Sequence, residues 1–95
     1  MVHGDSLSAA YGMAESQGWV SLLAKRCFCQ VINTSQSGET TDGGLSRLPV
    51  LLQQHRPDVV VLELGANDGL RGLPLARAEQ NLRRMVDLAR KARAR

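Results

Sequence analysis

Three short apolar runs, each followed by a glycine-bearing turn, constrain most strongly what this chain of 95 residues can fold into. The runs are residues 1–3, 27–32 and 58–64, and a stripe of apolar residues at helical spacing follows each turn, at residues 16–26, 45–55 and 75–89. Strands that alternate with helices in this way predict a parallel α/β sheet. The unalternated run at 59–62 is typical of a parallel strand that is covered on both faces.

One residue from each turn is a candidate for function. In parallel sheets, functional groups gather beyond the carboxyl ends of the strands. Ser6, Gly38 and Asn67 each follow a different predicted strand, so we expect them to meet at one edge of the sheet. A tight glycine turn lifts a serine hydroxyl away from the sheet edge and aims backbone N–H groups at the space above it. Nucleophilic acyl chemistry requires this arrangement of an exposed hydroxyl with donors for the oxyanion. Each residue also has a purely structural alternative. Ser6 could cap a helix, Gly38 could be an ordinary loop glycine, and Asn67 could close a turn.

These turns carry the blocks Gly-Asp-Ser-Leu-Ser at residues 4–8, Ser-Gly at 37–38 and Leu-Gly-Ala-Asn-Asp-Gly-Leu-Arg-Gly at 64–72. With them the chain resembles the SGNH (GDSL) hydrolases, and most of all their bacterial arylesterase, thioesterase I and lysophospholipase L1 branch. The resemblance implies a flavodoxin-like three-layer α/β fold with a parallel sheet, truncated here after the third strand and third helix. Residues 1–95 would then be the N-terminal part of a single hydrolase domain.

The resemblance also implies a serine esterase or thioesterase that hydrolyses small acyl esters through an acyl-serine intermediate. Ser6 would be the nucleophile, and the oxyanion would be held by the Ser6 N–H, the Gly38 N–H and the Asn67 side-chain amide. We read Asp5 and Asp68 as supporting residues that bond to the local backbone. Neither a cofactor nor a metal is expected.

The family's Asp-x-x-His block is absent, so the base that would activate Ser6 has no obvious source. His55 precedes the third predicted strand and should lie at the opposite end of the sheet, and His3 is expected to be a structural histidine of the first strand. Turnover is therefore expected to collapse towards the residual level of an oxyanion hole alone. The alternative is a non-catalytic acyl-binding or assembly module that self-associates through the exposed edge of its third strand. Glu63, in that strand, could bond a loop N–H.

Composition adds a few exclusions. The formal net charge is +3, but the basic excess belongs to the last helix, which carries no aromatic residues among its charges, so we expect no nucleic-acid binding. No run is long and apolar enough for a membrane span. Family members are often periplasmic or secreted, and no signal segment precedes Gly4 here. Cys27 and Cys29 are expected to be buried free thiols, because two residues that close along one strand cannot bridge comfortably.

Overall fold

The computed structural model describes residues 1–27 and 29–94 of the chain. In chain order the elements are β1 (Val2–Gly4), α1 (Ser6–Ala9), the 3-10 turn η1 (Glu15–Gln17), α2 (Trp19–Arg26), α3 (Thr41–His55), β2 (Val61–Glu63), α4 (Ala66–Leu70) and α5 (Leu75–Lys91). β1 and β2 pair in parallel, with Val2 opposite Val61 and Gly4 opposite Glu63. The predicted α/β class with parallel strands is confirmed.

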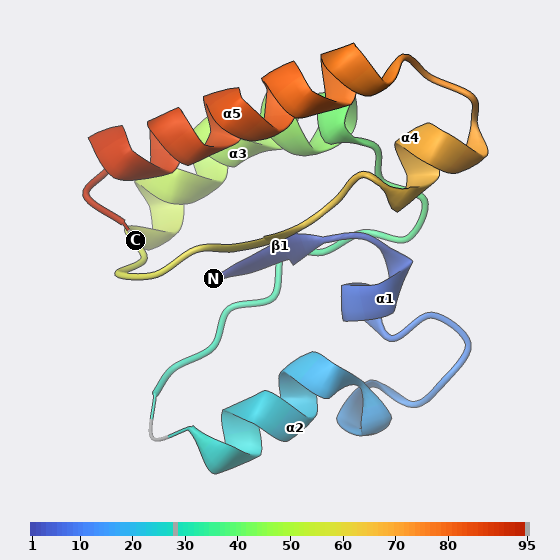
Figure 1. Ribbon diagram of the computed structural model, residues 1–95. Helices are drawn as coiled ribbons and strands as arrows, with labels where there is room; N and C mark the ends of the chain where they lie inside the picture. Colours follow the sequence, from blue (N-terminus) through green and yellow to red (C-terminus); the bar gives the residue numbers. More distant parts are fainter. Residues whose placement is uncertain (28, 95) are drawn as a thin grey trace.

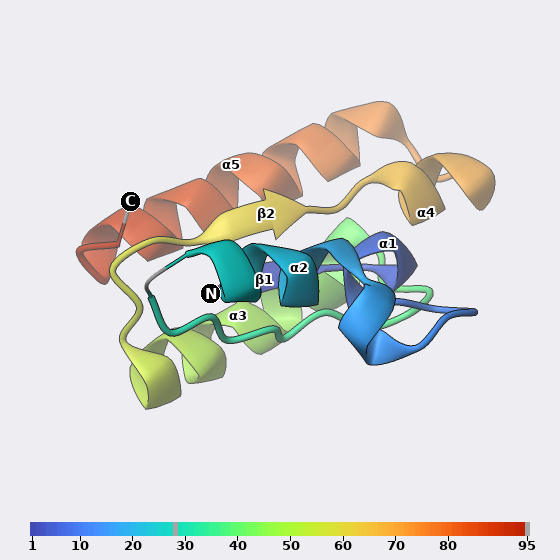
Figure 2. The same cartoon turned by 90° about the horizontal axis from the view of Figure 1, so that it is seen from below.

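The helices form layers on both faces of the strand pair. α3 and α5 lie together over one face and α2 lies over the other (Figure 1). Seen from below, α2 lies in front of β1, and β2 lies beside β1 on the side of α5 (Figure 2). The core lies between the strands and the α3/α5 layer. Its fully buried members are Leu48, Leu52 and Met85, against which partly buried side chains pack: Met1, Leu45, Val60, Leu62, Leu64, Leu82 and Leu88.

The strand predicted at residues 27–32 is displaced. The chain reaches β1 only near Ile32, where the Val2 N–H donates to the Ile32 carbonyl at 2.7 Å and the Thr34 N–H donates to the Val2 carbonyl at 2.8 Å. These contacts amount to a single parallel bridge between Val2 and Asn33. The three-stranded flavodoxin-like arrangement is therefore not confirmed in the part of the chain that is described. Phe28, which belongs to the predicted strand, lies outside the described residues.

β2 is shorter and more exposed than its apolar sequence suggests. The prediction that the run at 59–62 is covered on both faces is wrong, since Val59 is 53% exposed and Val61 is 42% exposed. Val60 and Leu62, which alternate with these valines, pack against the core, so only the face of the strand that points to α3 and α5 is covered.

The helix predicted at residues 45–55 begins earlier, at Thr41. Its N-cap is Thr40, whose hydroxyl accepts a hydrogen bond from the Gly43 N–H at 3.4 Å. Pro49 consequently lies inside α3 rather than in its first turn. The glycines at the start of the helix concealed it, because glycine has low helix propensity.

The other helices follow the predicted stripes with shifted ends. The helix predicted at residues 16–26 begins at Trp19, after the N-cap residue Gly18, and Ser16 lies in η1. α5 begins at Leu75 as expected, but Leu75 is 83% exposed although it belongs to the apolar stripe. The predicted loop at 65–74 contains the short helix α4. Within the described residues, no helix has the length and apolar character needed to cross a membrane.

The prediction of free thiols is wrong, because Cys27 and Cys29 form a disulfide with their Cα atoms 5.2 Å apart. That separation lies in the ordinary range for a disulfide. The two cysteines do not lie on one extended strand, because Cys27 is the C-cap residue of α2.

Candidate active site

Ser6 and Asn67 lie where the two parallel strands end. Ser6 is the first residue of α1, directly after β1, and Asn67 lies in α4, directly after β2. Because Gly4 pairs with Glu63, the two strand ends are adjacent. The loop that contains Gly38 reaches the same edge, since the Gln36 N–H donates to the Gly4 carbonyl at 3.0 Å. In Figure 1 α1 and α4 follow the same ends of the strands.

Asp5 shapes the turn that presents Ser6. Its side chain is 1% exposed and accepts a hydrogen bond from the Leu7 N–H at 3.0 Å, which caps α1. This is the local backbone bond that the sequence suggested. Within the described residues, neither the Ser6 hydroxyl nor the Ser6 N–H makes a hydrogen bond, so both remain available to a substrate.

Glu63 joins β2 to this turn through a network of hydrogen bonds. The sequence indicated Glu63 as a member of such a network but not the other residues. Its Oε1 accepts from the Asp5 N–H at 3.3 Å and from the Ser8 hydroxyl at 2.8 Å. The Ser8 oxygen in turn accepts from the indole N–H of Trp19 at 3.1 Å. Burial raises the pKa of Glu63, and the nearby Asp5 carboxylate raises it further, while the hydrogen bond from Ser8 opposes the rise. Two of these bonded residues, Asp5 and Ser8, flank Ser6.

Asn67 is held against the loop of Gly38. Its side-chain Nδ2 donates to the Glu39 carbonyl at 2.9 Å, and Arg71 donates to the Gly38 carbonyl at 3.2 Å. Gly38 has a φ of +79°, a conformation that favours glycine. Its N–H has no acceptor among the described residues. Because an amide nitrogen carries two hydrogens, Asn67 keeps one donor beyond its bond to the loop.

Asp68 fixes α4 to the beginning of α3. Its carboxylate, 4% exposed, accepts from both the N–H and the hydroxyl of Thr41. Asn81 of α5 donates to the same hydroxyl at 3.0 Å. Asp68 therefore bonds backbone as expected, but at a distant residue rather than a local one. A carboxylate at a helix N-terminus is also favoured by the helix dipole.

His3 is part of the framework. Its ring is fully buried, with Nε2 2.8 Å from the Gly44 carbonyl and Nδ1 2.8 Å from the Thr34 hydroxyl. A carbonyl only accepts, so Nε2 carries the hydrogen, and in the neutral ring Nδ1 is an acceptor. The Thr34 hydroxyl has one hydrogen to donate and lies between Nδ1 and the Val2 carbonyl, which is 3.1 Å away. Burial is the main cause that lowers the pKa of His3, which favours this neutral form. Both ring nitrogens are occupied, and neither faces Ser6 as a base.

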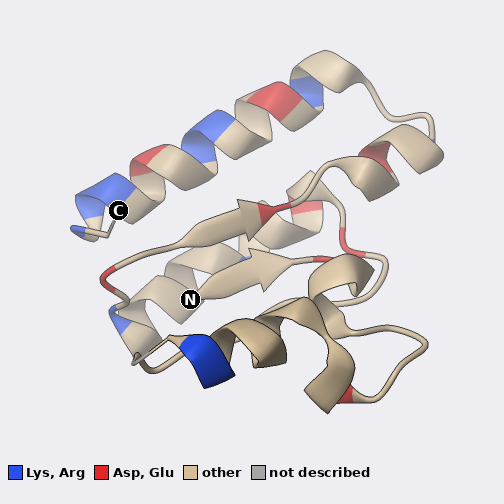
Figure 3. Cartoon of the chain, turned by 60° about the horizontal axis from the view of Figure 1, so that its bottom comes forward, with Lys and Arg blue, Asp and Glu red and all other residues tan. Residues whose placement is uncertain are grey.

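Acidic and basic residues are distributed unevenly over the fold. Basic residues lie along α5 and at the end of α2, whereas acidic residues follow both strands (Figure 3). No cluster of three or more side chains suited to a metal ion occurs in the described ranges. The residues that sequence reasoning missed, such as Ser8, Trp19, Thr41 and Asn81, are polar side chains bonded across long sequence separations, for which no local motif exists.

A sequence profile of the GDSL-like lipase/acylhydrolase family matches residues 2–95. The chain belongs to this family. Among curated relatives it is 54% identical to Esterase TesA of Pseudomonas aeruginosa, over 99% of this chain and 48% of that protein. It is 46% identical to Thioesterase 1/protease 1/lysophospholipase L1 of Escherichia coli (strain K12), over 99% of this chain and 46% of that protein.

Solved structures of similar proteins have the same fold. The crystal structure of TesA matches with a TM-score of 0.96 and 52% identity, over 99% of this chain and 55% of that one. The psychrotrophic esterase EstA from Pseudoalteromonas sp. matches with a TM-score of 0.91 and 47% identity, over 98% of this chain and 54% of that one. The chain spans about half the length of the curated relatives it matches.

Proposed function

We propose that this chain carries the nucleophile and the oxyanion hole of an esterase or thioesterase that cleaves acyl esters through an acyl-serine intermediate. Ser6 attacks the acyl carbon, and the developing oxyanion accepts hydrogen bonds from Ser6 N–H, Gly38 N–H and the Asn67 amide. Membership in a family whose relatives are named esterase and thioesterase supports the reaction class.

One observation carries the proposal. The Ser6 hydroxyl and the N–H groups of Ser6 and Gly38 make no hydrogen bond within the described residues, although they belong to a strand edge whose neighbouring polar groups are bonded. Hydrogen-bond donors that are fixed in place but have no acceptor are suited to stabilise negative charge that develops during a reaction. Removal of a single such donor lowers a rate by about 10²–10³.

The general base is not supplied by either histidine of the chain. His3 is bonded at both ring nitrogens. His55 lines a cavity together with Met1, at the amino end of β1, whereas Ser6 follows its carboxyl end. The proposal therefore includes catalysis at about 10³–10⁴ over water, the level that an oxyanion hole and binding can provide without a base.

Hydrolysis of a p-nitrophenyl ester tests this proposal with the chain, its Ser6→Ala variant and a Ser46→Ala control on the exposed side of α3. Slow release of p-nitrophenol that depends on Ser6 and not on Ser46 is expected. Vigorous Ser6-dependent turnover would show that a base is present after all. Equal rates for all three proteins would remove Ser6 from the reaction.

We also infer that residues 1–95 form the N-terminal part of one hydrolase domain, in which residues 32–36 act as a third, flavodoxin-like strand beside β1. The hydrogen bonds from Val2 N–H, Thr34 N–H and Gln36 N–H, which join this segment to β1, support the inference.

The exposed edge of β2 favours a second candidate, a non-catalytic acyl-binding or assembly module in which two copies pair through β2. Val61 at this edge is 42% exposed, and a lysine there would oppose pairing. Sedimentation of Val61→Lys should then show loss of dimer, while Val50→Lys, at an exposed position of α3, should leave it intact. Fatty-acyl binding that is unaffected by Ser6→Ala would favour this module, and a monomer at all concentrations would exclude pairing.

A further inference from the structure

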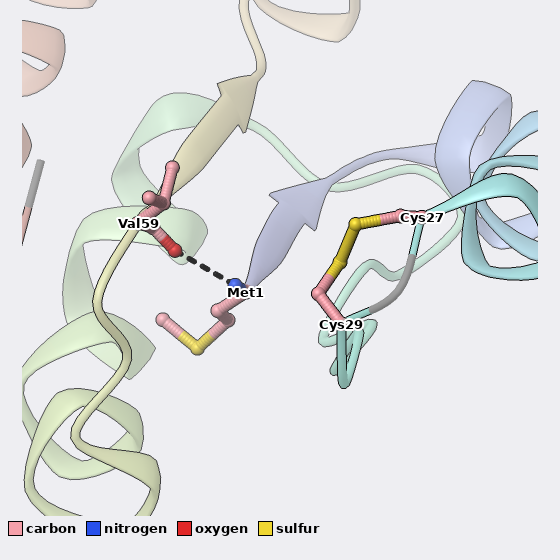
Figure 4. Close-up of a disulfide and its surroundings, with 4 residues drawn as sticks. All are labelled: Met1, Cys27, Cys29 and Val59. Carbon is pink, nitrogen blue, oxygen red and sulfur yellow. Dashed lines mark hydrogen bonds between the residues drawn. A yellow bond between two sulfur atoms is a disulfide. The ribbon is translucent and has the colours of Figure 1, made fainter.

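The disulfide between Cys27 and Cys29 lies far from the candidate active site, beside the beginning of β1. Figure 4 shows Met1 between the disulfide and Val59, to whose carbonyl the Met1 nitrogen donates at 2.8 Å. Cys27 is partly buried and Cys29 is exposed, so the bond can be reached from solvent at Cys29.

This disulfide does little to hold the fold together. It joins two cysteines that are two positions apart in one segment and therefore links no separate elements. The entropic stabilisation by a disulfide grows with the length of the loop that it closes, and this loop is among the shortest possible. Exposed disulfides that contribute little to stability are the ones that commonly exchange with thiols.

A cavity of about 310 Å³ opens beside Cys29. Three of its ionisable side chains are His55, Arg56 and Asp58, all from the segment that leaves α3. Arg56 is exposed and forms no ion pair or side-chain hydrogen bond among the described residues, so its guanidinium is available to an anion. It also holds an unfavourable left-handed backbone conformation, with a φ of +44°, beside this cavity.

We propose that Cys27–Cys29 is a thiol–disulfide exchange site for small thiols that carry carboxylates, with Arg56 binding the carboxylate. The thiolate of the incoming thiol attacks the Cys29 sulfur and forms a mixed disulfide, while the bond to Cys27 breaks and Cys27 leaves as a thiolate. A second thiol attacks the mixed disulfide, releases the oxidised small-molecule disulfide and leaves Cys29 reduced. Two small thiols are oxidised and the protein disulfide is reduced, so electrons balance.

Two features favour attack at Cys29. Cys29 is the more exposed of the two residues and lines the cavity. Cys27 follows Lys25 and Arg26, the basic residues of the last turn of α2, which offset the negative end of that helix for a leaving thiolate.

The test measures how fast glutathione and its monoethyl ester open the disulfide in the intact chain, with alkylation and mass spectrometry as the readout. The two thiols differ in one carboxylate, and each rate is divided by the rate with a small reference disulfide. Glutathione is expected to react about fivefold faster than the ester, which is the effect of two opposite unit charges about 4 Å apart at the dielectric constant of water, about 80. Arg56→Gln should abolish this preference, whereas Arg84→Gln, an exposed position of α5, should retain it.

Peptide mapping should locate the trapped glutathione on Cys29, and reoxidation by oxidised glutathione should restore the disulfide in the folded chain. The proposal is overturned if glutathione opens the bond only after the chain unfolds, if the adduct forms on Cys27, or if the preference survives Arg56→Gln. None of these results depends on the esterase proposal, because Ser6 takes no part in the exchange.

Discussion

Asp68 provides the sharpest test of how the chain fixes the loops around Ser6. Its buried carboxylate accepts the N–H of Thr41 at 2.8 Å and the Thr41 hydroxyl, and Thr41 is fully buried. Asp68→Ala removes both acceptors. The hydroxyl can rotate towards another partner, but the amide hydrogen is fixed by the backbone of α3 and loses its acceptor.

An unsatisfied buried donor costs about 1–3 kcal/mol, and more when the lost partner was charged. We therefore expect Asp68→Ala to lower the free energy of unfolding by about 2–4 kcal/mol. For a domain of this size that corresponds to a decrease in Tm of roughly 10–25 °C. Asp68→Asn keeps one acceptor oxygen for the Thr41 N–H but loses the charge, and should cost about 1–2 kcal/mol.

Urea denaturation followed by circular dichroism measures these differences. Asp87→Asn, an exposed aspartate of α5, is the matched control and should change stability by less than about 0.5 kcal/mol. If Asp68→Ala unfolds within about 0.5 kcal/mol of the wild type, the carboxylate does not hold α3 and α4 together as argued.

The remaining predictions concern the core and two titratable groups, Glu63 and His3. Leu48→Ala, at a fully buried position of α3, should cost about 2–5 kcal/mol in urea denaturation, whereas Val50→Ala, 58% exposed on the same helix, should cost far less. Because burial raises the pKa of Glu63, the folded chain binds the carboxyl proton more tightly than the unfolded chain does, so stability should fall as pH rises from 4.5 through the raised pKa. Glu63→Gln, which keeps the acceptor oxygen, should lose this decline in a denaturation series. Because burial lowers the pKa of His3, stability should fall as pH drops below 6.5, and a denaturation series on His3→Gln that retained this fall would assign it to another group.

The sequence predicted those parts of the fold that depend on local pattern. The apolar stripe that begins at Leu75 predicted α5, and the apolar run before Gly65 predicted β2. The spacing of apolar residues indicates which face of a helix or strand can be buried. It misplaced the segment between Cys27 and Asn33, where apolar composition resembled a strand but the disulfide and the end of α2 determine the path.

The early start of α3 could not be predicted for a different reason. Its first N–H is capped by Asp68, which lies 27 residues further along the chain. Tertiary contacts of this kind override helix propensity and leave no local signal. The network of Ser8, Trp19 and Glu63 was hidden in the same way, although Glu63 within an apolar strand indicated that a partner must exist.

A crystal structure of the chain after reaction with an alkylphosphonate probe would test most directly whether Ser6 is a nucleophile served by the neighbouring loops. The account predicts phosphorus bonded to Ser6 Oγ, with one phosphonyl oxygen about 2.7–3.1 Å from the Ser6 nitrogen, the Gly38 nitrogen and Asn67 Nδ2. An adduct on another serine, or a Ser6 adduct whose oxygens meet none of these donors, would contradict it.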